Sequence, residues 1–169
     1  MNWLEKHRRK IEDMRMPETV VMVSSTSICI HSDMFRDNKH LKEIRLPKTV
    51  QYIERTSFRN CTSLEKINLP AQVYFIHEQT FKGCVSLKEI IAEKPEPPKC
   101  VLDAESMNMD DVLDSVYVPK IPAFLRKKDG KYFEGVNKQT CIVRVPRGSV
   151  ELYKQAKEWK EFENIVEIW

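Results

Sequence analysis

Residues 50–70 read VQYIERTSFRNCTSLEKINLP, and residues 73–90 read VYFIHEQTFKGCVSLKEI. The second stretch repeats the first at an offset of 23 (73 − 50), which we call the repeat period. A fixed period of this length is typical of a solenoid of stacked supersecondary units. The same period continues toward the N-terminus, where five residues precede their counterparts in residues 58–70. These are Phe35, Leu41, Ile44, Leu46 and Pro47. The sequence therefore predicts a repeat architecture.

Each repeat carries the pattern Leu-x-x-Ile-x-Leu-Pro, as in residues 41–47. The alternation at Ile44 and Leu46 predicts a short strand with these two side chains pointing inward. The proline that follows ends the strand, because it has no N–H to donate. A second extended segment is predicted at residues 50–53 and again at residues 73–76. Each coil should therefore contain two short strands.

A column of phenylalanines, which includes Phe58 and Phe81, should anchor a short helical turn on the remaining side of each coil. We expect these rings to form a continuous buried stack. The chain reverses after the turn, and the reversal position holds Asp37, Asn60 and Gly83. These residue types tolerate positive φ, so we interpret the column as left-handed residues that end the turn.

Charged pairs precede each inward isoleucine, and their order alternates from one repeat to the next. They read Lys42-Glu43, Glu65-Lys66 and Lys88-Glu89. Stacking in register places opposite charges side by side in both columns, whereas a slip by one repeat would place like charges together. Each pair contributes only about 0.2–1 kcal/mol, so these six residues favour the register and keep the face soluble rather than bind a partner.

The strand pattern predicts one solenoid of about seven rungs, with strands that start at residues 21, 44, 67, 90, 116, 143 and 166. We interpret the chain as a single domain over residues 1–169. Its predicted parts are an N-terminal helical cap (1–17), regular repeats (18–92), two enlarged repeats (93–145) and a C-terminal capping helix with the last strand (146–169). Helices are expected over residues 104–113, 122–128 and about 150–160.

The C-terminal helix should begin at Ser149, which is a good N-cap residue. Val150, Tyr153 and Trp159 are spaced to cover the open end of the solenoid. At the other end, residues 2–15 place a thin apolar stripe on a basic helix, which fits a cap over the first rung better than a helix on a membrane surface.

Composition is that of a soluble globular chain, with 41% hydrophobic and 31% charged residues and a net charge of +3. A net charge so close to zero does not indicate nucleic-acid binding, which requires a concentrated basic surface. No apolar run approaches the roughly 20 residues of a membrane span. The N-terminus has no signal peptide. We therefore expect a cytoplasmic protein if the sequence is full length, and a surface or secreted one if an export signal lies outside it.

Residues 57–70 and 80–90 resemble the BspA-like leucine-rich repeat family of gut and oral bacteria. The tail, with VPRGSVELYK at residues 145–154 and NIVEI at residues 164–168, resembles the terminal cap of those proteins. The matches cover about residues 20–92 and 116–168. The resemblance implies a right-handed α/β solenoid, with short parallel strands on one side and short helices or turns on the other. It also implies a non-catalytic binding module, with adhesion or host-surface binding in relatives.

The five cysteines form no Cys-x-x-Cys pair. Cys29-x-His31 is too little for a zinc site without distant partners, and Cys61 and Cys84 share a repeat position that predicts burial. We therefore expect no catalytic residues, no metal site and no cofactor. The alternative from another class is a thiol-dependent enzyme or redox protein. It would use one of the cysteines outside that column, namely Cys29, Cys100 or Cys141, and would need a reactive thiol of low pKa.

The outward middle residue of each rung offers a candidate binding surface. The column comprises Arg45, Asn68, Ile91, Tyr117 and Arg144, with Met22 and Glu167 at its two ends. Aromatic residues and arginine are enriched at binding surfaces, and repeat proteins bind partners on extended faces. We expect a monomer that binds a protein or surface ligand here. The alternative is that Ile91 and Tyr117 only pack beneath neighbouring side chains.

Overall fold

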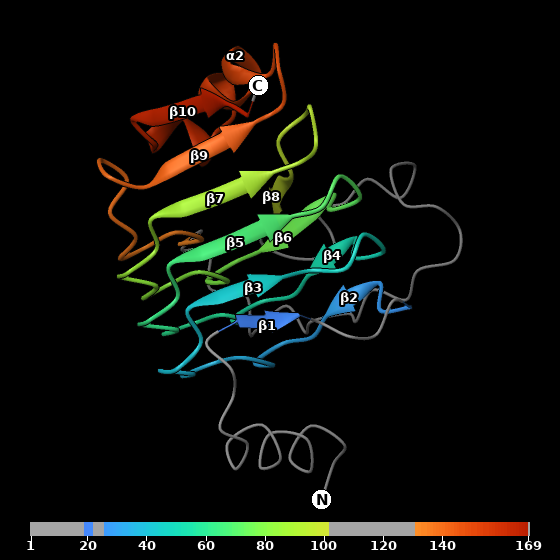
Figure 1. Ribbon diagram of the computed structural model, residues 1–169, viewed down its shortest axis with the longest axis vertical. Helices are drawn as coiled ribbons and strands as arrows, with labels where there is room; N and C mark the ends of the chain where they lie inside the picture. Colours follow the sequence, from blue (N-terminus) through green and yellow to red (C-terminus); the bar gives the residue numbers. More distant parts are fainter. Residues whose placement is uncertain (1–18, 22–25, 102–130, 169) are drawn as a thin grey trace, which may run out of the picture.

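A computed structural model describes residues 19–21, 26–101 and 131–168, which form two parallel sheets. The six-stranded sheet comprises, in spatial order, β1 (Thr19–Val21), β3 (Glu43–Arg45), β5 (Lys66–Leu69), β7 (Glu89–Ala92), β9 (Ile142–Val145) and β10 (Asn164–Glu167). The four-stranded sheet comprises β2 (Cys29–Ile30), β4 (Tyr52–Ile53), β6 (Phe75–His77) and β8 (Lys99–Val101). In Figure 1 the strands of both sheets stack along the long axis of the molecule.

Strand pairing confirms the repeat period in the central coils. Ile44 pairs with Ile67, and Ile67 pairs with Ile90, in the six-stranded sheet. In the other sheet, Ile53 pairs with Ile76. All five isoleucines are fully buried, because alternation along each short strand turns them toward the space between the sheets. Each coil therefore contains two strands, as the sequence predicts.

The third side of each coil consists of turns, and the predicted phenylalanine stack lies behind them. Phe35, Phe58 and Phe81 are at most 3% exposed. Their ring centroids are 5.2 and 5.5 Å apart, with interplanar angles of 1°. The stack continues at 5.5 Å to Phe133 in the next coil. Offset stacking of this kind adds to the burial energy of each ring and holds successive coils at one spacing.

The reversal column has the predicted backbone geometry. Asp37, Asn60 and Gly83 have φ of 61°, 58° and 79°, and Gly135 takes the same place in the next coil with φ of 89°. The N–H of Asn60 donates to the carbonyl of Lys82 at 2.7 Å, and the other coils repeat this bond. The left-handed residue thus turns its N–H toward the neighbouring coil.

A second left-handed column was not predicted. Asp33, Thr56 and Gln79 have φ of 60°, 58° and 57°, and they too recur at the repeat period. Threonine and glutamine rarely adopt this conformation, so residue type gave no signal. Inter-coil bonds stabilise the column, since the hydroxyl of Thr56 donates to the carboxylate of Asp33 at 2.7 Å.

The predicted rung at residues 116–118 is wrong, because β7 pairs directly with β9. Residues 102–130, which include the helices predicted at 104–113 and 122–128, lie outside the described residues. Phe133 stacks directly on Phe81 at an offset of 52 (133 − 81), so the coil between them is 29 residues longer than the repeat period (52 − 23). The excess is therefore an insertion within one coil. A short Val-x-Val pattern cannot by itself distinguish an insertion from a rung.

The two end strands are each displaced by one residue from the prediction. Val20, rather than Val21, pairs with Ile44, and Ile165, rather than Val166, pairs with Val143. The prediction assumed a constant repeat period, which holds only where the coils are equal in length. The first coil has one more residue between its two strands, and the last coil returns through helices instead of a second strand.

The C-terminal cap begins at Ser149, as predicted, but its α-helix is shorter than expected. Helix α2 spans Val150–Gln155, and a 3-10 helix, η4, spans Trp159–Glu161. Ser149 makes no side-chain capping bond. Tyr153 and Trp159 are at most 1% exposed, so they cover the end of the core. The helical cap predicted for residues 1–17 lies outside the described residues.

The central ring of the stack should be essential for stability. We expect Phe58→Ala to lower the free energy of unfolding by about 3–5 kcal/mol, because it opens a cavity between two stacked neighbours. Urea denaturation would measure the loss. Val85→Ala is the control, since Val85 is 58% exposed on the turn side and should change stability by less than about 0.5 kcal/mol. Equal effects of the two substitutions would contradict the role of the stack.

Substitutions at two glycines would distinguish the cost of backbone strain from the cost of steric crowding. Gly83 and Gly148 both have φ of 79°, but a Cβ at Gly148 would meet nothing within 4 Å, whereas a Cβ at Gly83 would overlap Oδ1 of Asn60. We expect Gly148→Ala to cost about 1–2 kcal/mol from the left-handed backbone alone. Gly83→Ala should cost more in the same denaturation experiment. Equal losses would show that the coils do not crowd each other at the reversal column.

Candidate functional site

The predicted binding column lies on the outward face of the six-stranded sheet. Arg45, Asn68, Ile91 and Arg144 are consecutive register partners on four neighbouring strands. Tyr117 lies outside the described residues, and its predicted place between Ile91 and Arg144 does not exist, because these two residues pair directly. Val166, rather than Glu167, pairs with Arg144 at the C-terminal end. Met22, at the other end of the predicted column, also lies outside the described residues.

Asn68 stabilises the sheet as well as lying on its face. Its side-chain oxygen accepts a hydrogen bond from the N–H of Leu46 at 2.8 Å, and its amide nitrogen donates to the carbonyl of Leu46 at 3.4 Å. Leu46 lies just beyond the end of β3. The side chain of Asn68 therefore continues the hydrogen bonding between β3 and β5 by one residue. This residue is half-buried and already paired.

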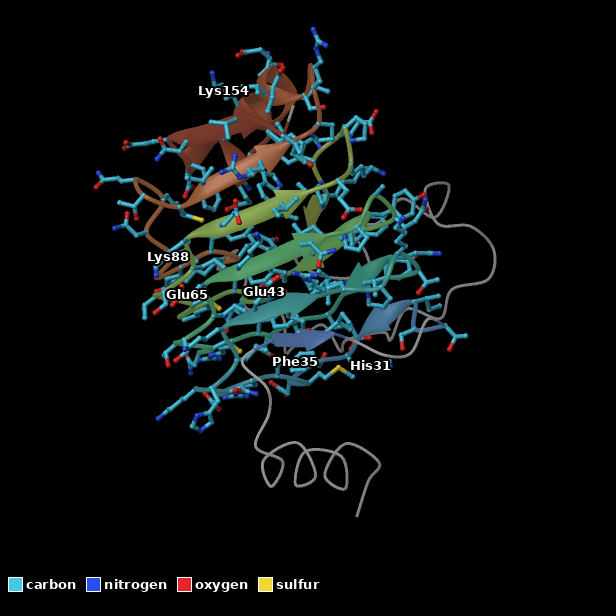
Figure 2. The ribbon with its side chains drawn as sticks, viewed as in Figure 1. His31, Phe35, Glu43, Glu65, Lys88 and Lys154 are labelled. Carbon is cyan, nitrogen blue, oxygen red and sulfur yellow. The ribbon has the colours of Figure 1, made fainter. Side chains whose placement is uncertain are left out.

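Alternating charges occupy the face beside this column, in the predicted register. Lys66 pairs with Glu89 at 2.7 Å, and Lys88 pairs with Glu65 at 2.9 Å. Figure 2 shows Glu65 and Lys88 next to each other where their strands begin. Arg144 also contacts Glu89, so this carboxylate lies between two cations. Burial alone would raise the pKa of Glu89, but its hydrogen bonds to Lys66 and Arg144 outweigh that effect and lower it.

Apolar side chains surround Arg144 at the C-terminal end of the face. Ile91 and Val166 flank it in register on either side, and Ile142 precedes it by two residues on the same face. Val166 is 39% exposed, and both isoleucines are half-buried. We call these four residues, Ile91, Ile142, Arg144 and Val166, the C-terminal patch. Arg45, at the other end of the column, has a side chain that is 65% exposed and paired to Glu43.

Three of the cysteines are completely buried. As predicted, Cys61 and Cys84 lie in the core, where their thiols donate to the carbonyls of Phe35 and Phe58 in the preceding coil. Cys141 is equally buried, although it was expected outside the core column. Burial raises the pKa of Cys84 and of Cys141 to about 12. These thiols are packing residues, because a buried cysteine behaves as a small apolar side chain.

Cys100 was also expected outside the core column, but it pairs with the buried Ile76. It is packed against the core and is only partly exposed. Burial raises the pKa of its thiol above the usual range. Alternation explains the position, since the neighbouring Lys99 is exposed on the opposite face of the strand.

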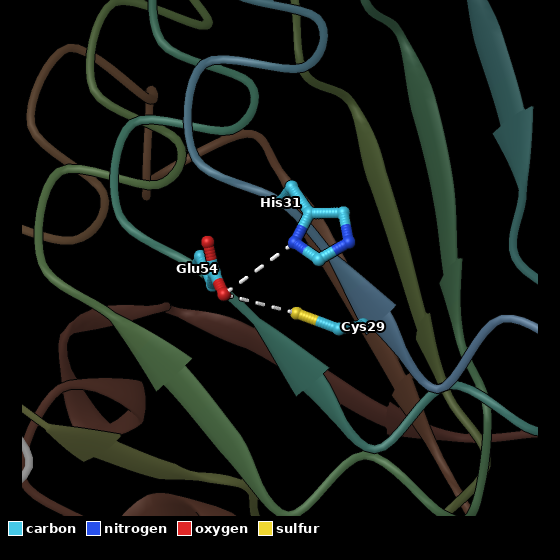
Figure 3. Close-up of side chains that lie close together, drawn as sticks. All are labelled: Cys29, His31 and Glu54. Carbon is cyan, nitrogen blue, oxygen red and sulfur yellow. Dashed lines mark hydrogen bonds and ion pairs between the residues drawn. The ribbon is translucent and has the colours of Figure 1, made fainter. Parts of the chain in front are cut away.

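Cys29 lies in a polar cluster that the sequence did not reveal. Its thiol donates to Oε1 of Glu54 at 3.3 Å, and Nδ1 of His31 lies 3.6 Å from the same oxygen (Figure 3). Glu54 comes from the next coil, where it follows Ile53, the register partner of Ile30. His31 and Glu54 therefore share one repeat position and lie one full period apart in the sequence. This offset of one repeat period was the only signal in the sequence that could have predicted the contact between His31 and Glu54.

Comparison with known proteins identifies the repeat. The sequence profile described as the BspA type leucine-rich repeat region matches residues 10–96 in six copies, which is just over half of the chain. The chain belongs to the BspA-type leucine-rich repeat family. Repeats of this kind generally serve as non-enzymatic surfaces for protein interaction. The resemblance seen in the sequence is thus confirmed.

A crystal structure of a leucine-rich repeat protein from Bacteroides ovatus ATCC 8483 is similar to this BspA-type chain. The TM-score is 0.47 and the identity is 19%, over 91% of this chain and 34% of that one. The chain therefore spans about a third of the length of that protein. No curated protein matches the sequence. Within the described residues, none of the helices is long and apolar enough to cross a membrane.

The paired carboxylate on the sheet face should make stability depend on pH. Because the pKa of Glu89 is lower in the folded chain, its contribution is fully present above the unfolded pKa and is lost as the pH falls through the folded one. We expect Glu89→Gln to lower Tm near neutral pH by about 2–4 °C, equivalent to about 1 kcal/mol. The difference from wild type should shrink in acid.

The matched control for this experiment is Glu93→Gln. Glu93 is exposed just after the end of β7, so this substitution removes a carboxylate without removing the contacts with Lys66 and Arg144. Thermal unfolding followed by circular dichroism at neutral and acid pH would measure both variants. A deficit in Glu89→Gln that stayed constant with pH would show that the ion pairs do not cause it.

Proposed function

We propose that this chain is a non-catalytic protein-interaction module that binds its partner through the outward face of the six-stranded sheet. The contact residues are Arg45, Asn68, Ile91 and Arg144 of the predicted column, together with Ile142 and Val166. Tyr117 remains a candidate from the sequence alone. The observation that carries the proposal is the C-terminal patch, where apolar side chains from three neighbouring strands surround one arginine.

Physical chemistry supports this choice of face. Partly exposed isoleucine and valine gain free energy when a partner removes them from water, and arginine is among the residues enriched at the centres of interfaces. Glu89 holds the guanidinium of Arg144 in place, so little rotamer entropy is lost on binding. The Lys66–Glu89 ion pair, on β5 and β7, borders the patch, as the polar rim of an interface would. The partner that fits is a protein surface with an apolar centre and an acceptor for Arg144.

Adhesion, or binding to a host or cell surface, is the setting that the family resemblance suggests for this interaction. We propose it as the biological context, with the folded chain acting as a monomer. The support is the resemblance of the repeats and of the terminal cap. A column of basic side chains on the turns, which includes Arg36 and Lys82, would suit an acidic partner. It is a weaker candidate, because both side chains already contact carboxylates.

The thiol-dependent alternative receives no support from the cysteines. A thiol nucleophile needs a lowered pKa and access to a substrate. Here burial raises the pKa of every cysteine, and the charge of Glu54 raises that of Cys29 further. Titration with a thiol reagent at neutral pH would test this point. A cysteine of the native chain that reacted faster than free cysteine would favour the alternative.

Charge placed in the C-terminal patch should weaken partner binding. We expect Ile91→Asp to weaken the binding of any specific partner by about 2 kcal/mol, which is roughly thirtyfold in Kd, because the aspartate would have to be desolvated beside Glu89. The measurement is a pull-down with the immobilised chain from the proteins of host and neighbouring cells, followed by titration of each captured protein.

The matched control is Val85→Asp, which makes the same kind of change on the turn side, where Val85 is 58% exposed. Circular dichroism should show both variants folded. Proteins captured by wild type and Val85→Asp, but lost with Ile91→Asp, would support the proposal. A partner that bound Ile91→Asp as well as wild type and was lost with Val85→Asp would place the interface on the turns.

A further inference from the structure

We propose that Cys29, His31 and Glu54 form a binding site for a divalent transition-metal ion, with Zn²⁺ as the best fit. The ligand atoms are Sγ of Cys29, Nδ1 of His31 and Oε1 of Glu54, which lie within 4.8 Å of one another. The cluster lies on the four-stranded sheet, away from the face proposed to bind a protein (Figures 1 and 3). This site is independent of the proposed function.

Two of the three separations between the ligand atoms match those of a tetrahedral metal ion, and the third is at most 4.8 Å. With bonds of about 2.0–2.3 Å to oxygen, nitrogen and sulfur, a tetrahedral Zn²⁺ places its ligands about 3.3–3.6 Å apart. The observed separations from Oε1 of Glu54 are 3.3 Å to the sulfur and 3.6 Å to the nitrogen. The set needs little rearrangement to bind an ion.

Register explains why these three side chains converge. Ile30 points into the core, so Cys29 and His31 on either side of it point to the outer face of the sheet. Ile53 is the partner of Ile30 in the next strand. Glu54, the residue after Ile53, is therefore placed next to His31. Two rigid strand ends from neighbouring coils hold the site, as binding sites of defined geometry require.

Ser32 positions the carboxylate. Its N–H and its hydroxyl donate to Oε2 of Glu54 at 2.8 and 3.0 Å. These two bonds satisfy one oxygen and turn the other toward Cys29 and His31. Partners of this kind, which orient a ligand without touching the metal, are typical of metal sites.

The chemical types of the three ligands determine which ion fits best. A thiolate with an imidazole favours Zn²⁺ and similar ions over Mg²⁺ or Ca²⁺, which prefer oxygen. On binding, the S–H bond of Cys29 breaks, a sulfur–metal bond forms and one proton passes to solvent. Three protein ligands leave a fourth position open. The His31 side chain is 52% exposed, so water has access to the site.

Titration with Co²⁺ tests the site in the intact chain, because cobalt bound by a thiolate shows a charge-transfer band in the near ultraviolet. We expect one equivalent of Co²⁺ to produce this band and one equivalent of Zn²⁺ to remove it by displacement, while excess Mg²⁺ has no effect. Cys29→Ser should lose the band, and Glu54→Gln should bind more weakly. Ser32→Ala should keep the band but weaken affinity about tenfold.

His40→Ala is the matched control, since His40 is exposed on a turn away from the cluster, and it should bind as wild type does. Circular dichroism would establish that each variant is folded. If wild type gave no charge-transfer band, or if Cys29→Ser gave the same band as wild type, the proposal would be overturned. The cluster would then be a hydrogen-bonded group that only joins β2 to β4.

Discussion

Stacking of identical positions from coil to coil is the constraint on which this structure depends. The phenylalanine rings show it most directly, because each ring is buried against the equivalent ring of a neighbouring coil. A single coil could not bury its own apolar side chains. The inward isoleucines pair with their equivalents in the neighbouring coils. The turn N–H groups and the core cysteines donate hydrogen bonds to backbone carbonyls of the neighbouring coils.

Such a stack has two open ends, and the C-terminal one is closed by aromatic side chains. Phe133 makes edge-on contacts with Trp159 and Phe162, at centroid distances of 5.1 Å, so the column of parallel rings ends there. Trp159 and Tyr153 also donate hydrogen bonds to the carbonyls of Pro98 and Lys94. The cap is thus attached to the preceding coil by both apolar and polar contacts, as a terminal unit of a repeat protein requires.

Both surfaces that could bind something arise from the same constraint. Register places Ile91, Arg144 and Val166 side by side although they are distant in sequence, and it places Glu54 beside His31 on the other sheet. Neither arrangement disturbs the core, because alternation along a strand separates inward from outward positions. The stacked core can therefore stay the same while the outward residues vary, which is how one fold presents different binding faces.

The sequence by itself determined the regular part of this protein. The repeat period predicted both strands of each central coil, the buried phenylalanine column, the left-handed residues at Asp37, Asn60 and Gly83, and the charge register of the sheet. These features are local or strictly periodic, so each position predicts the next. Tertiary structure decided what breaks the period: the insertion between β8 and Phe133, the displaced end strands and the burial of Cys100 and Cys141. It also decided which outward residues meet, because direct pairing of β7 with β9 joins Ile91 to Arg144 across the insertion. Spacing along the chain cannot show where a coil is interrupted, since only the packing of the next coil reveals where the stack resumes.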